Sequence, residues 1–148
     1  MSAKHNPLTL ILPIKSQQNF QELKGLFEKM QDDESNPVFT ALNTIKTVHF
    51  ARFVFLDTET DNPKLLVATT YDGDEDDYFD DFLASPTAVP VFNQILCHIK
   101  DAPPLPVNEH KDDFKKYLRE ENGRLPAMLF YSAYPNKTVE NILGGLGW

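Results

Sequence analysis

The sequence predicts one α+β domain, spanning residues 1–148, in which a four-stranded antiparallel sheet carries helices on one face. Three observations support this prediction. Short apolar runs of strand length alternate with amphipathic stretches of helical spacing. Two of the strand-like runs are joined by a short polar turn, which favours antiparallel pairing. The chain has 148 residues, 41% of them hydrophobic, so it can bury a core without disulfides.

The first strand and the first helix are predicted near the start of the chain. Residues 8–14 form a short apolar run after a proline, which is typical of a strand. Ser16 then stands where a helix N-cap belongs. Apolar residues at spacings of three and four predict an amphipathic helix over residues 17–31. Residues 37–43 predict one more helical turn.

A β-hairpin is predicted in the middle of the chain. Residues 46–57 and 64–71 are strand-like, and the segment between them is rich in Asp, Thr, Asn and Pro. If the turn is centred between Thr60 and Asp61, the predicted cross-strand neighbours are Phe50 and Tyr71, Arg52 and Thr69, Phe53 and Ala68, and His49 and Asp72. A shift of one residue would exchange the two faces of a strand.

Four helices and a last strand are predicted in the second half. The acidic run and the Ser85-Pro86 pair favour two helix starts, and a proline-rich connector follows. The predicted elements are a helix from Asp74 to about Ala84, a helix from Ser85 to about residue 100, a polar helix over about 109–121, a strand over 127–134 (AMLFYSAY) and a short helix capped by Thr138.

This order of elements predicts the ferredoxin-like βαββαβ arrangement, with an extra helix before the last strand. The first strand is apolar on both faces, with Leu10 and Leu12 on one and Ile11 and Pro13 on the other. Because strands of this kind need cover on both faces, we expect a homodimer whose two sheets pack face to face into a dimeric α/β barrel.

Composition limits the classes of function. The net charge of −8 argues against nucleic acid or an anionic membrane as a partner. No apolar run approaches the roughly 18 residues of a membrane span, and the N-terminal run does not have the form of a signal peptide. The single cysteine, Cys97, lies in an apolar run and is expected to be a small core residue, which fits a cytoplasmic protein.

Two polar residues interrupt the strand at residues 46–57. Because side chains alternate along a strand, His49 is expected on the face of Phe53 and Phe55, and Arg52 on the opposite face. His49 is interpreted either as a strand-end histidine hydrogen-bonded to a neighbour, or as a ligand contact or acid–base group oriented by Asp72. Arg52 is interpreted either as a structural ion pair with a nearby acid or as an anchor for an anion.

The sequence offers little sign of a metal site. Asp72, Asp74 and Asp76 have the alternating spacing of a calcium loop, but Asp77 and Leu83 stand where that loop needs Gly and Glu. Acids at a helix N-terminus also favour the helix dipole. The histidines lack metal-ligand spacing, and the sequence has no HExxH, CxxC, GxSxG or phosphate-loop pattern. We therefore predict no metal site.

Three segments carry a resemblance to a known family. They are HFARFVFLD at residues 49–57, LLVATTYDGD with DDYFDDF within residues 65–82, and YPNKTVENI at residues 134–142. Over about residues 8–143 the chain resembles an uncharacterised bacterial family of the dimeric α/β-barrel (ferredoxin-like) superfamily. That superfamily also contains dye-decolourising peroxidases, chlorite dismutase-like proteins and small monooxygenases.

The resemblance implies a ligand in a cavity beside the sheet. Haem members use a proximal histidine, a distal arginine and, in some peroxidases, an aspartate, and the matching residue types here are His49, Arg52 and Asp72. The peroxidase signature Gly-x-x-Asp-Gly corresponds to residues 69–73, where Thr69 replaces the first glycine.

Two classes of function stay open. The first is a small-molecule-binding or oxidoreductase-like protein that takes a small apolar or aromatic ligand, with haem as a candidate cofactor and catalysis undecided. Its candidate ligand-binding residues are His49, Arg52, Asp72, Tyr71, Phe53, Phe55 and Phe82. The second is a non-catalytic dimeric structural or interaction module.

Overall fold

The computed structural model describes residues 5–33, 35–121 and 123–145. Residues 1–4, part of the segment in which no signal peptide is expected, and residues 146–148 lie outside the described residues. The described chain is a mixed α and β structure built on a four-stranded, open, antiparallel sheet of order β2-β3-β1-β4. The strands are β1 (His5–Pro13), β2 (Val48–Leu56), β3 (Lys64–Asp72) and β4 (Arg124–Leu125).

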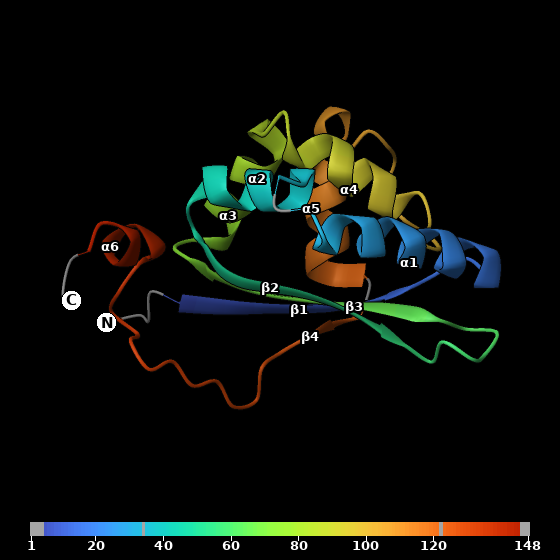
Figure 1. Cartoon of the computed structure of the whole chain (residues 1–148), viewed down its shortest axis with the longest axis horizontal. Coiled ribbons are helices and arrows are strands. Elements are labelled where there is room, and N and C mark those ends of the chain that lie inside the picture. Colours follow the sequence, from blue (N-terminus) through green and yellow to red (C-terminus); the bar gives the residue numbers. More distant parts are fainter. Residues whose placement is uncertain (1–4, 34, 122, 146–148) are drawn as a thin grey trace.

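Helices cover one face of this sheet. Figure 1 shows α1 to α5 on the same side, whereas the segment between β4 and α6 crosses the opposite side. The helices are α1 (Gln17–Gln31), α2 (Pro37–Ile45), α3 (Glu75–Ala84), α4 (Ala88–Leu96), α5 (Lys111–Lys116) and α6 (Val139–Leu143), with a 3₁₀ turn at Val107–Glu109 and a π-helical turn at Tyr117–Glu121. None of the described helices is long and apolar enough to cross a membrane.

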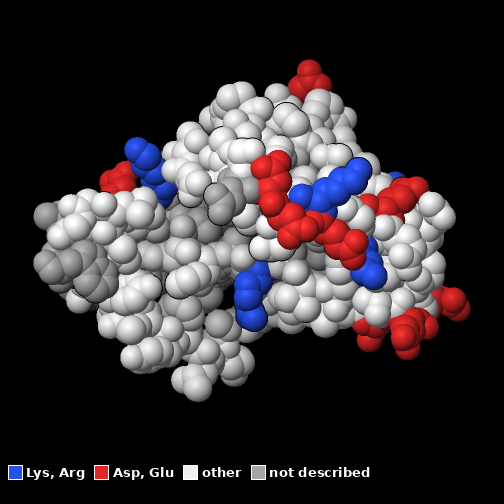
Figure 2. Space-filling model, in the orientation of Figure 1, with Lys and Arg blue, Asp and Glu red and all other residues white. Residues whose placement is uncertain are grey.

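Charge is distributed unevenly over the surface. In the view of Figure 2, acidic side chains lie beside basic ones over the helical layer. The surface at the lower left, over the segment that leads from β4 toward α6, is white. In this view, the charge-poor surface thus lies over the segment between β4 and α6, away from most of the helices.

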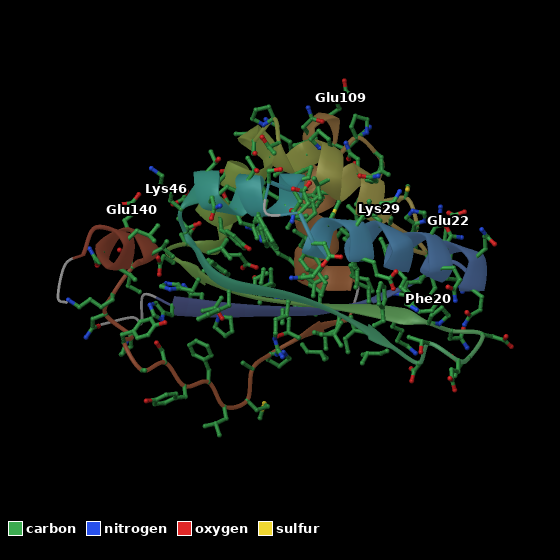
Figure 3. All side chains as sticks on the ribbon, in the orientation of Figure 1. Phe20, Glu22, Lys29, Lys46, Glu109 and Glu140 are labelled. Carbon is green, nitrogen blue, oxygen red and sulfur yellow. The ribbon has the colours of Figure 1, made fainter. Side chains whose placement is uncertain are left out.

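The local signals at the helix starts are confirmed. The Ser16 side chain accepts a hydrogen bond from the backbone N–H of Asn19 and begins α1. Asp74 caps α3, and Thr138 forms a capping box with Asn141 in α6. In Figure 3, Phe20 of α1 points to the sheet, whereas labelled charged residues such as Glu22 and Lys29 point outward. These signals act over three or four residues, so the sequence contains them in full.

The predicted hairpin forms, but its predicted register is wrong by one residue. Phe53 pairs with Val67 rather than Ala68, and Arg52 pairs with Ala68 rather than Thr69. A β-bulge between Val48 and Phe50 then shifts the register again. The bulge inserts one unpaired residue, His49, into β2 and interrupts the alternation of side chains. The sequence analysis predicts His49 on the face of Phe53 and Phe55. Because of the bulge, His49 lies on the opposite face instead.

The predicted last strand is also corrected. The only sheet pairing beyond residue 121 in the described chain is the short β4, which pairs with Thr9 and Leu10 of β1. Residues 127–134 are not a strand. Pro126 follows β4 directly and has no N–H to donate to a ladder, so pairing stops there. The chain then leaves the sheet edge with Met128 and Leu129 exposed.

Three smaller differences concern the helices and the cysteine. The predicted helix from Ser85 begins later, at Ala88, although the Ser85 hydroxyl accepts a hydrogen bond from the Ala88 N–H. It ends at Leu96, and Cys97 is exposed rather than buried. The predicted polar helix is divided into α5 and the π-helical turn.

Candidate functional site

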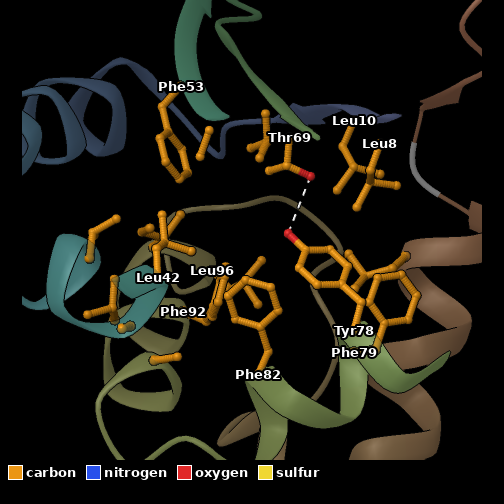
Figure 4. A pocket seen from close by; sticks show the side chains of 18 of the residues that line it. Leu8, Leu10, Leu42, Phe53, Thr69, Tyr78, Phe79, Phe82, Phe92 and Leu96 are labelled. Atoms are coloured by element: carbon orange, nitrogen blue, oxygen red, sulfur yellow. Dashed lines mark hydrogen bonds between the residues drawn. The ribbon is translucent and has the colours of Figure 1, made fainter. Parts of the chain in front are cut away.

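An apolar cavity lies between the sheet and the helical layer. Its volume is about 80 Å³. Figure 4 shows side chains of the sheet, such as Leu10 and Phe53, facing side chains of α2, α3 and α4, such as Leu42, Phe82 and Phe92. Such a volume is several times the roughly 10–15 Å³ that one water molecule requires, and the walls offer water almost no polar partner.

The cavity has one polar feature. Among its described lining residues, only Thr69 and Tyr78 carry polar side chains, and the Tyr78 hydroxyl donates a hydrogen bond to Thr69 Oγ1 over 3.3 Å. Burial raises the pKa of Tyr78 far above its ordinary value, so the phenol stays neutral. The lining therefore suits only an uncharged, largely apolar group.

A second cluster of side chains lies on the opposite face of the sheet. His5 at the start of β1, His49 at the bulge of β2 and Asp72 at the end of β3 meet there. His49 Nε2 lies 2.7 Å from Asp72 Oδ1, and His5 Nε2 lies 3.8 Å from the same oxygen. The two imidazole rings are tilted against each other with centroids 4.1 Å apart. The bulge is the cause, because it turns His49 away from the helical face.

The segment before α6 closes around this cluster. The Ser132 hydroxyl and the His5 Nδ1 are 2.8 Å apart, and His5 Nε2 is 2.6 Å from the Lys137 carbonyl oxygen. The Val139 N–H donates to the second oxygen of Asp72 over 2.7 Å. All three side chains of the cluster are buried as a result, and the sheet and the C-terminal segment are held together at this point.

The sequence-predicted site residues do not gather in one pocket. Phe53 and Phe82 line the apolar cavity, whereas His49 and Asp72 lie across the sheet. Phe55 packs against rings of α1, outside the described lining of the cavity. Tyr71 is buried and stacks on Tyr78 with centroids 4.0 Å apart, and burial raises the pKa of its hydroxyl, with a further contribution from Glu75.

Arg52 is exposed, so it does not form the buried ion pair that the sequence left open. Among the described residues it has no ion pair, and it borders a groove between β2 and the helices α1 and α2. A guanidinium that water can reach needs no compensating acid, so the exposed Arg52 side chain does not require an ion pair.

Sequence reasoning missed His5 altogether. It lies close to the N-terminus, far along the chain from the hairpin, and no local spacing connects it to His49 or Asp72. The pairing of β1 with β3 places His5 directly opposite Asp72. Only a correct prediction of that register could have found the cluster.

The acidic run at the start of α3 has structural partners. Asp74 caps the helix, Asp76 is held by Lys115 and Arg119, and Glu75 pairs with Arg124. Asp76 and Glu75 therefore join α3 to the elements that follow.

Comparisons with models of protein families, with curated proteins and with solved structures give no match for this chain. A function for the apolar cavity or for the cluster of His5, His49 and Asp72 can therefore be inferred only from their own chemistry.

Proposed function

We propose that this chain is a small-molecule-binding protein that takes a compact, uncharged, apolar ligand, such as a small aromatic ring, in the cavity between sheet and helices. The cavity of about 80 Å³ carries the proposal. Protein interiors are close-packed, and an empty volume of this size costs about 2 kcal/mol at roughly 24 cal/mol per Å³. A ligand that fills the space restores those contacts and recovers this free energy.

The walls of the cavity support an apolar ligand and do not fit haem. Among the described lining residues there is no histidine, cysteine or methionine to bind iron. The Tyr78 oxygen is bonded to Thr69 and held neutral, and His49 lies on the other face of the sheet in contact with Asp72. No redox chemistry is therefore included in the proposal.

We further propose that the chain is a ferredoxin-like domain that forms a dimeric α/β barrel. The strand order β2-β3-β1-β4 supports this, since it places the hairpin at one edge and the last strand at the other. Exposed apolar side chains favour a second copy on the non-helical side. They include Phe50 at 65% exposure, and Leu125, Met128 and Leu129 along the C-terminal segment. If no ligand binds, this surface instead supports a non-catalytic interaction module.

A pair of matched substitutions tests ligand binding. Val67 lines the cavity, whereas Val54 is exposed outside it. We expect benzene and toluene to cause saturable chemical-shift changes in the wild-type chain. Val67→Phe should fill the cavity and weaken binding by about 10-fold or more, equivalent to about 1.4 kcal/mol, and Val54→Phe should leave it unchanged. Absence of saturable binding to the wild type, or equal binding by a folded Val67→Phe chain, would refute the proposal.

A further inference from the structure

We propose that His5, His49 and Asp72 form a binding site for a divalent transition-metal ion. The three side chains come from three different strands and offer one ligand atom each, all within 4.8 Å of one another. Their side chains are only 3%, 4% and 9% exposed. The site lies across the sheet from the apolar cavity, so it does not depend on the ligand proposed there.

The donor set selects the kind of ion. Two imidazole nitrogens and one carboxylate oxygen suit zinc and its neighbours in the first transition row, whereas calcium and magnesium prefer oxygen ligands only. The ion would bring a double positive charge to a carboxylate that is otherwise shared by two imidazoles. Zinc is the appropriate probe because it has no redox chemistry of its own.

The geometry converges on one point. Around Asp72 Oδ1, the Nε2 atom of His49 lies at 2.7 Å and the Nε2 atom of His5 at 3.8 Å. Ligand atoms bound to one tetrahedral zinc ion lie about 3.3 Å apart, because each bond is about 2.0–2.1 Å long. The two histidine-to-aspartate separations lie on either side of this value, and all three ligand atoms lie within 4.8 Å of one another.

The surroundings hold the ligands in the orientation that a metal site uses. The Ser132 hydroxyl lies 2.8 Å from His5 Nδ1, which leaves Nε2 facing the cluster. The Val139 N–H binds Asp72 Oδ2, which leaves Oδ1 facing both histidines. Contacts of this type fix the ring and carboxylate orientation at established metal centres, and losing one typically lowers metal affinity about 10- to 100-fold.

Two further features of the chain lie beside the three ligand atoms. In the metal-free chain His5 Nε2 donates a hydrogen bond to the Lys137 carbonyl oxygen over 2.6 Å, so an ion would take the place of that proton. His5 and His49 also border a hollow of about 150 Å³, lined further by Phe50, Thr70 and residues 130–134. The chain therefore supplies three side-chain ligands, and two of them border this hollow.

The alternative to a metal site is a hydrogen-bond network with a purely structural role. The experiment below distinguishes the two. One histidine suffices to pair with Asp72, and the 2.7 Å contact of His49 already does so. A second buried imidazole lies against the first, with its Nε2 only 3.8 Å from the same oxygen, and this third metal-ligating side chain favours an ion.

Zinc binding to the untagged, full-length, metal-free chain tests the proposal by titration calorimetry. We expect one zinc ion per chain. His5→Ala and His49→Ala should each weaken binding by about 100-fold or more, and Ser132→Ala by about 10-fold. His98→Ala and His110→Ala serve as controls, because these histidines contact other partners, and they should leave binding unchanged.

A second measurement covers variants that fail to fold. In the wild-type chain, equimolar zinc should shift the imidazole nitrogen resonances of His5 and His49. The resonances of His98 and His110 should stay in place. Unmoved resonances at His5 and His49, or one-to-one binding that persists in folded His5→Ala and His49→Ala chains, would overturn the proposal and leave the hydrogen-bond network as the role of the cluster.

Discussion

Gly123 marks the residue at which the chain enters β4. Its φ is +69°, in the left-handed region that favours glycine. A Cβ placed there would collide with the backbone carbonyl oxygen of Ile11. The Gly123 carbonyl also accepts a hydrogen bond of 3.1 Å from the Ile11 N–H. The close approach of β4 to β1 therefore depends on the absence of a side chain at this position.

Gly123→Ala should lower the free energy of unfolding by about 1–3 kcal/mol, because it combines an unfavourable φ with a backbone collision. Gly25→Ala is the matched control. Gly25 lies inside α1 with nothing near its Cβ position, and the substitution should stabilise the chain by about 0.5–1 kcal/mol. Urea unfolding measures both, and equal effects of the two substitutions would contradict this account of β4.

Residues also differ in how far their environment could be foreseen. The contact of His49 with Asp72 was predicted, and the two side chains lie 2.7 Å apart. It arises from the bulge in β2, which the sequence did not predict. Strict alternation predicted the wrong face for His49 because a bulge depends on the pairing of two strands rather than on β2 alone.

At the scale of elements, ion pairs connect α3 with α5 and the π-helical turn that follows. Asp76 Oδ1 lies 2.7 Å from Arg119 Nη2 and 3.1 Å from Lys115 Nζ, and Lys115 also pairs with Asp80 at 2.6 Å. Hydrogen bonds from Arg119, and then from Lys115, hold the pKa of Asp76 below its ordinary value. The folded chain thus binds this proton more weakly than the unfolded chain does.

This shift sets a direction for the pH dependence. The stability that the Asp76 carboxylate contributes is complete above its ordinary pKa of 3.8 and is lost as the pH falls through the lower folded value. The wild type should therefore have a higher urea midpoint than Asp76→Asn at neutral pH, and the difference should shrink below about pH 4. Added salt should also reduce it, because these groups are exposed.

Asp81 provides a control of opposite sign. Burial, and then the charges of Asp77 and Asp80, raise the pKa of its carboxyl, so ionisation disfavours the folded chain. Asp81→Asn should raise the urea midpoint at neutral pH, and this gain should vanish at pH values below 3.8. A midpoint difference of the same sign for both variants would show that the two carboxylates are not in these environments.

At the scale of the whole molecule, the two sides of the sheet differ in cover. Helices bury one side, whereas among the described residues the segment between β4 and α6 crosses the other (Figure 1). Met128 and Leu129 of that segment are 93% and 94% exposed. Apolar side chains this exposed, together with Phe50 and Val54 on β2, favour burial against a second copy.

The proposed homodimer predicts a measurable mass. Light scattering at micromolar concentration should give about twice the 16.9 kDa of one chain. The double variant Met128→Glu and Leu129→Glu should give the monomer mass, because it places charge in the interface. Phe39→Glu, on the helical side, is the control and should remain dimeric. A monomeric wild type would contradict the proposal.

The sequence by itself determined the elements whose causes are local. The amphipathic spacing and Ser16 define α1, turn residues define the hairpin, and Asp74 and Thr138 begin their helices, because each signal acts within a few residues. The tertiary structure alone decided the rest. Strand register, the bulge at His49 and the early end of β4 depend on pairing between distant segments, and it is that pairing which brings His5 to Asp72.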